Sequence, residues 1–183
     1  DAAGQFERFD LALKKAEEEY DAIIAEGFEQ PANRAQLFDV LFNHDWGYFA
    51  NEFLVRNGWT ILAVEQEFSL MYDEETESTY PFVVDMVVKD PEGVYVVIDH
   101  KFVNDFYTPA QTDLQPQIPK YIGALRALDY EIGYGAYNML RTRKLKEPAS
   151  DSMNYFMILK PNADRVLNTF MEQIGVAAEI QAL

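Results

Sequence analysis

The sequence predicts an α/β domain, in which a central mixed β-sheet is flanked by helices and further helices lie at the N-terminus. Two runs rich in Val and Ile, residues 82–88 and 94–98, are typical of buried strands. Residues 6–23 instead place apolar side chains three or four apart, which is the period of an amphipathic helix. With 183 residues, of which 49% are hydrophobic, the chain is long and apolar enough for one domain with a core.

Two helices are expected ahead of the sheet. The first lies within residues 1–30, and it either packs on the rest of the domain, residues 31–183, or forms a coiled-coil contact with a partner. The second begins near Asn33, a residue type that caps helices, and ends near Gly58.

A half-exposed strand is predicted over residues 60–72, because its apolar and polar side chains alternate. This alternation places Glu65 and Glu67 on one face, where they meet either solvent or the acidic residues of the next hairpin. That hairpin joins the two Val-rich runs through residues 90–93, where Pro fixes φ and Gly accepts a positive φ.

The elements after the hairpin are also readable. Thr108 and Pro109 can begin a helix as its cap and first residue. Gln117 and Tyr121 are four residues apart and therefore lie on one face of the next helix. Further strands are predicted over residues 133–140 and 153–159, followed by a last helix capped by Asn162.

Three charged side chains interrupt the apolar hairpin. Asp85 lies inside its first strand, and Asp99 and Lys101 follow its second. Because side chains alternate along a strand, Asp99 and Lys101 point to the same face. Two neighbouring carboxylates in an apolar hairpin are costly, because they repel each other and lose hydration. A bound cation or ligand would offset this cost, so this hairpin is the candidate site.

This hairpin resembles the PD-(D/E)XK nuclease superfamily, in particular its RecB-type exonuclease branch. The family pattern is an Asp on one strand and then Asp or Glu, any residue and Lys on the next. Here it reads Asp85 and then Asp99-His100-Lys101. Further branch features occur in order between about residues 35 and 165, namely His44, the Q-x-x-x-Y pair Gln117 and Tyr121, and a later strand ending at Arg141 and Arg143.

The resemblance implies a restriction-endonuclease-like core and a metal-dependent DNA nuclease, expected to be an exonuclease in recombination, repair or phage DNA processing. Mg²⁺ or Mn²⁺ would be held by Asp85, Asp99, His44 and the backbone carbonyl of His100. Lys101 would orient the attacking water or stabilise the developing charge. Gln117 and Tyr121 would position the DNA strand, and Arg141 and Arg143 would contact its backbone.

The net charge of −16 opposes a DNA-binding function, because phosphate contacts normally come from Lys and Arg. Its distribution is uneven, since residues 120–146 hold six basic and two acidic residues while residues 1–30 hold nine acidic and three basic ones. DNA would then meet a basic edge on an acidic body, or a partner protein would supply DNA grip or helicase activity. The alternative is a catalytically silent nuclease-like module that binds DNA or a partner.

Composition excludes several other classes of protein. The chain has no cysteine, which excludes disulfides, thiolate metal sites and iron–sulfur clusters. No apolar run approaches the ~20 residues that span a bilayer, and the sequence does not open on a signal segment. We therefore expect a cytoplasmic protein with no membrane partner.

Overall fold

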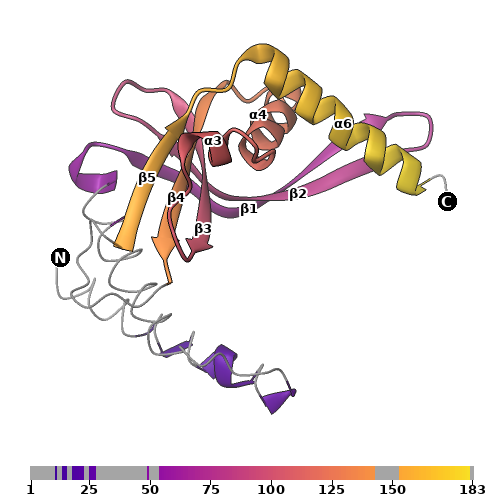
Figure 1. The fold of residues 1–183 in the computed structure, drawn as a ribbon. Helices are drawn as coiled ribbons and strands as arrows, with labels where there is room; N and C mark the ends of the chain where they lie inside the picture. The colour runs from indigo at the N-terminus through magenta and orange to yellow at the C-terminus, as the bar shows by residue number, and fades with distance from the viewer. Residues whose placement is uncertain are drawn as a thin grey trace.

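The chain is an α/β protein built on a five-stranded mixed sheet (Figure 1). The computed structural model describes residues 54–142 and 153–181, together with residues 11, 14–15, 18–22, 25–27 and 49. Its elements are β1 (Thr60–Asp73), β2 (Ser78–Lys89), β3 (Tyr95–Val103), α3 (Pro109–Thr112), α4 (Gln117–Ala127), β4 (Ile132–Arg141), β5 (Asn154–Leu159) and α6 (Ala163–Gln181).

The strand order is β1-β2-β3-β4-β5, so each strand lies beside its neighbour in sequence. The pairs β1–β2, β2–β3 and β4–β5 are antiparallel, whereas β3 and β4 are parallel. A parallel pair needs a crossover connection, which here carries α3 and α4. The prediction of a central mixed sheet with helices is therefore confirmed.

Helices α4 and α6 cover one face of this sheet (Figure 1). They approach closely because glycines stand at the contacts: a Cβ on Gly135 of β4 would collide with Ile118 of α4. A Cβ on Gly123 of α4 would likewise lie only 2.7 Å from Cβ of Phe170 in α6. Helix α4 is thus held directly against the two central strands, and the residues at its start stand over β3.

The opposite face of the sheet has a separate apolar cluster. Phe49 and Leu54, which precede the first strand, are fully buried there against side chains of β2, β3 and β4. The predicted stop of the preceding helix at Gly58 is confirmed, because this residue has φ +77° and Trp59 N–H donates to Leu54 O. The described residues between 11 and 25 are helical, and the rest of the predicted N-terminal helices lies outside the described residues.

Strict alternation along the first strand, as predicted for residues 60–72, is wrong. Glu65 adopts φ +48°, and the pairing register of β1 with β2 shifts between Ile61 and Ala63. As a result Ala63 and Phe68, five residues apart, both pack against the core under α4. Glu65 and Glu67 are exposed to solvent.

Several helix and strand ends agree with the sequence. Thr108 caps α3 with Pro109 as the first helical residue, and Asn162 accepts from Arg165 N–H at the start of α6. Strand β3 is longer than predicted and continues to Val103. In the described part of the chain, no helix combines the length and the apolar character that crossing a bilayer requires.

The turn between β2 and β3 is fastened by a buried carboxylate. Asp90 accepts from the N–H groups of Glu92 and Val94, and Tyr134 Oη donates to its other oxygen at 2.6 Å. Burial opposes the charge, but the bond from Tyr134 and those from the turn prevail and lower the pKa of Asp90. The hairpin that carries Asp85 and Asp99 is thereby anchored to β4.

We expect Tyr134→Phe to lower the free energy of unfolding by about 1–3 kcal/mol, because it removes a buried hydrogen bond to a charged group. Urea unfolding would measure the change. Tyr130→Phe is the matched control, since Tyr130 is 48% exposed. Equal stability of Tyr134→Phe and the parent would contradict the anchoring role.

Candidate active site

The candidate site lies where β2 and β3 separate. Their ladder runs from the pair Lys89–Tyr95 to the pair Met86–Ile98 and ends there. Beyond this point β3 remains paired with β4 alone among the described residues, from Asp99 to Val103. At this point a side chain of β2 replaces the backbone pairing: Asp85 Oδ2 accepts a hydrogen bond from the peptide N–H of His100 at 2.8 Å. The separation makes room for side chains between β2 and β3.

Asp99 is fully buried beside this separation, with 0% of its surface exposed. Lys101 Nζ lies 2.8 Å from its Oδ2 as an ion pair. Beyond this ion pair, neither oxygen accepts a hydrogen bond from the described residues. Burial raises the pKa of Asp99 to about 6, against the attraction of Lys101 and with the repulsion of Asp85.

Lys101 is held by α4. Its Nζ donates to Gln117 Oε1, and Gln117 Nε2 donates to Tyr121 Oη at 2.8 Å. Burial raises the pKa of Tyr121, and Asp99 and Asp85 add to this effect. The structure therefore brings together five of the residues singled out in the sequence, Asp85, Asp99, Lys101, Gln117 and Tyr121, on the face of the sheet that α4 covers.

The start of α4 depends on a residue that the sequence did not reveal. Arg165 of α6 donates to the carbonyls of Thr112 and Gln115 and pairs with Asp113 at 3.1 Å. These contacts hold the segment that leads into Gln117. An Arg three residues after a helix cap is common, so no local signal distinguishes it.

The side chain of His100 does not belong to this group. It lies on the opposite face of the sheet, where its ring meets Phe49 edge-on at 5.7 Å and its Nδ1 lies 2.8 Å from Asn138 Nδ2. Only the backbone of His100 faces the separation. The N–H and C=O of one residue in a strand point to the same side, so the carbonyl of His100 is directed toward the same gap as its N–H.

The donor set suits a hard divalent cation in its chemistry but is incomplete within the described residues. Carboxylate and carbonyl oxygens are the ligands of Mg²⁺ and Mn²⁺, and the buried Asp99 Oδ1 without a donor is an acceptor that such an ion would satisfy. No group of three or more His, Cys, Asp or Glu side chains forms a metal site in the described part of the chain. His44, the predicted third side chain, lies outside the described residues.

The predicted basic edge is partly used within the fold. Arg126 donates to the carbonyls of Ile132 and Gly133, and the side chain of Arg141 is 17% exposed. The guanidinium of Arg141 stacks on Phe106 at 4.1 Å and lies 4.0 Å from Asp105. Arg143 lies outside the described residues. Contacts of Arg141 with DNA would therefore compete with its contacts in the protein.

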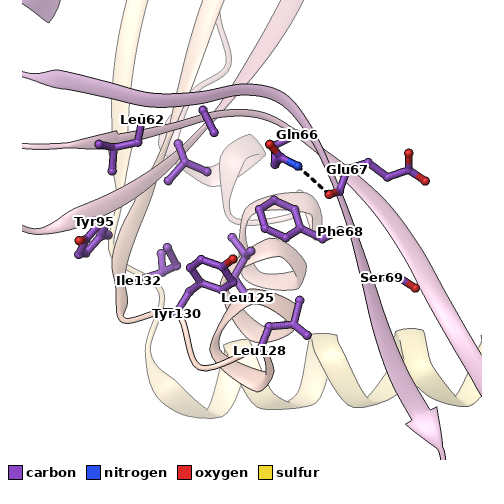
Figure 2. Close-up of a pocket in the computed structure, with 12 residues that line it drawn as sticks. Leu62, Gln66, Glu67, Phe68, Ser69, Tyr95, Leu125, Leu128, Tyr130 and Ile132 are labelled. Atoms are coloured by element: carbon purple, nitrogen blue, oxygen red, sulfur yellow. Dashed lines mark hydrogen bonds between the residues drawn. The ribbon is translucent and has the colours of Figure 1, made fainter.

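A hollow of about 650 Å³ lies at the other end of α4 (Figure 2). It is lined by apolar and aromatic side chains such as Phe68, Leu125 and Tyr130, and Gln66 Nε2 donates to the Glu67 carbonyl at its wall. None of the five residues gathered around Lys101 lines it. The five residues singled out in the sequence thus lie apart from this hollow.

Comparison with known proteins leaves the family open. No protein-family model matches the chain, and no curated protein matches it. Solved structures do match, and one of them is the crystal structure of SSO0001. It aligns over 91% of this chain and 85% of its own length, at 11% sequence identity and a TM-score of 0.40. A likeness this distant establishes neither fold family nor function, so the function of this chain has to be inferred from the geometry of its own site.

Proposed function

We propose that the protein is a metal-dependent DNA nuclease of the PD-(D/E)XK superfamily, with a restriction-endonuclease-like core of the RecB exonuclease type. The observation that carries this proposal is the buried Asp99, whose oxygens have only Lys101 as a partner among the described residues. Leaving an acceptor unpaired in the core is costly. A site that must accept a cation provides a reason for this cost.

The arrangement of strands supports the same proposal. The two antiparallel hairpins, the helical crossover and the parallel fourth strand place Asp85, Asp99 and Lys101 at one strand separation. Asp85, Asp99 and the carbonyl of His100 would hold Mg²⁺ or Mn²⁺, with His44 as a further ligand. When bound, the cation would neutralise charge on the scissile phosphate and lower the pKa of a bound water.

The remaining residues have separate roles in this proposal. Lys101, held by Asp99 and Gln117, places a positive charge where the phosphate gains negative charge in the transition state. Tyr121 accepts its hydrogen bond from Gln117, so its own O–H can be donated to a phosphate oxygen. Gln117 thereby couples the position of the lysine to that of the substrate strand.

A second function is favoured by charge. The net charge is −16, and both Arg126 and Arg141 are engaged within the fold. A nuclease-like domain that binds DNA or a partner protein without cutting is therefore the alternative proposal. In either function, DNA would be bound by groups other than these two arginines or by a partner protein.

Cleavage of labelled linear DNA in Mn²⁺ distinguishes the two functions. We expect the purified protein to degrade the DNA and Asp99→Ala to lose this activity, because the buried carboxylate is then missing from the cation site. Glu131→Ala, which removes a carboxylate from an exposed position, is the matched control and should cleave like the parent. Equal cleavage by Asp99→Ala would refute the proposed site, and DNA binding without cleavage by the parent would favour the silent module.

A further inference from the structure

A row of polar side chains crosses the sheet on the face away from α4. Asn138 of β4 is 0% exposed and Asn154 of β5 is 6% exposed, although both strands are otherwise largely apolar. Asn154 Nδ2 donates to Asn138 Oδ1 at 2.8 Å. The other end of the Asn138 amide, Nδ2, lies 2.8 Å from His100 Nδ1.

The direction of these hydrogen bonds follows from the chemistry of the amides. Asn138 Oδ1 accepts a hydrogen bond from Asn154 Nδ2, so the Nδ2 of Asn138 is the group directed at His100. An amide nitrogen only donates, and His100 Nδ1 is therefore the acceptor. The ring of His100 is held in one orientation, with its edge-on contact to Phe49 as a second constraint.

Core packing alone does not explain this pair. A buried amide in a central strand costs free energy unless it is bonded, and a leucine of similar shape would fill the same space without polar groups. The row includes His100, and the peptide N–H of that same residue donates to Asp85 on the other side of the strand separation. The two amides are thus connected to the candidate site through one residue.

We propose that Asn138, supported by Asn154, is a positioning residue of the site. By fixing the His100 side chain on the far face, it fixes the backbone of His100, so that the N–H meets Asp85 and the carbonyl stays directed into the gap. The effect on metal binding rests on the proposed function, whereas the effect on the His100 backbone does not. In metal sites, groups that orient the ligands typically change metal affinity by about 10–100-fold.

The test is the double substitution Asn138→Leu with Asn154→Leu. Replacing both hydrogen-bond partners with apolar groups of similar shape can be nearly neutral for stability. His100 Nδ1 loses its Asn138 donor, however, so we expect a folded protein with a melting temperature below that of the parent. In the same protein, we expect faster hydrogen exchange of the His100 amide, measured by NMR without metal, and roughly 10–100-fold weaker Mn²⁺ binding by calorimetry.

Tyr134→Phe is the matched control, because Tyr134 is buried on the same face of the same strand and bonds to Asp90 instead. It should lower stability without touching His100, so its His100 exchange gives the increase that lost stability alone causes, while its Mn²⁺ affinity should stay close to that of the parent. If the double variant does not fold, Asn154→Ala, which removes only the outer amide, is measured in the same way and should change both quantities in the same direction.

The outcomes are distinguishable. Parent-like exchange of the His100 amide in a folded variant overturns the positioning role, whatever the protein does to DNA. Exchange faster than in Tyr134→Phe, together with weaker Mn²⁺ binding, supports it. If the parent itself neither binds Mn²⁺ nor cleaves DNA, the proposed function fails, and the exchange measurement still decides whether Asn138 positions His100.

Discussion

Lys101→Ala is expected to lower the rate of DNA cleavage at saturating Mn²⁺ by about 10²–10³-fold while metal binding is retained. This is the typical loss when one preorganised charge-stabilising donor is removed from an active site. Lys101 is no metal ligand at neutral pH, and its charge repels a cation. Its removal leaves Asp99 without its ion-pair partner, so Mn²⁺ affinity should stay the same or rise.

Single-turnover cleavage of linear DNA and calorimetric titration with Mn²⁺ check this prediction together. Lys89→Ala is the control, because it removes the same charge from a partly buried position at the other end of the β2–β3 ladder. Lost metal binding in Lys101→Ala would mean that the lysine shapes the site instead of acting on the reaction. Unchanged cleavage would remove Lys101 from the mechanism.

Asp99→Asn is expected to make the metal-free protein more stable above pH 6 while abolishing cleavage. In the folded protein the pKa of Asp99 is raised from 3.8 to about 6, and burial is the main cause. Between these two values the folded state keeps a proton that the unfolded chain has released. The free energy of unfolding therefore falls as pH rises through this window, and it remains lower above it.

A pKa difference of about two units corresponds to a cost of about 3 kcal/mol at neutral pH. This value already includes the attraction of Lys101, because the net direction of the pKa is upward. The neutral amide of Asn avoids the cost, so urea unfolding in EDTA should show a gain at pH 8 and little difference at pH 4. A parent more stable than Asp99→Asn at pH 8 would show that the buried charge is compensated.

The expected effects at Asp99 and Lys101 share one physical basis. Burial of the Asp99 charge lowers the stability of the metal-free protein, Lys101 offsets part of this cost, and the site is supported from two different elements. Lys101 is bound by Gln117 of α4, while Asp85 is bonded to the backbone of β3. The buried charge of Asp99 therefore costs stability in the metal-free protein, and the same charge would hold the cation in the proposed reaction.

Local patterns in the chain were enough to predict that strands and helices follow one another in this order from residue 60 onward, and to predict the acidic hairpin. Val-rich runs, a Pro-Gly turn and the spacing of Asp99 and Lys101 depend on local backbone geometry, in which the period of a strand places alternate residues on one face. The cap residues Thr108 and Asn162 are equally local, because their side chains bond to the next turn of the chain. Such features can be predicted from the sequence without knowledge of the tertiary structure.

The folded sheet and its helices determine which groups that are distant in the sequence come into contact. The end of the β2–β3 ladder, the αL backbone of Glu65 and the packing of Arg165 against the start of α4 depend on neighbours far along the chain. The same holds for Asn138, whose amide has these partners only because β3, β4 and β5 lie side by side. Propensity and period act over a few residues, whereas burial and hydrogen-bond partners are set by the assembled sheet.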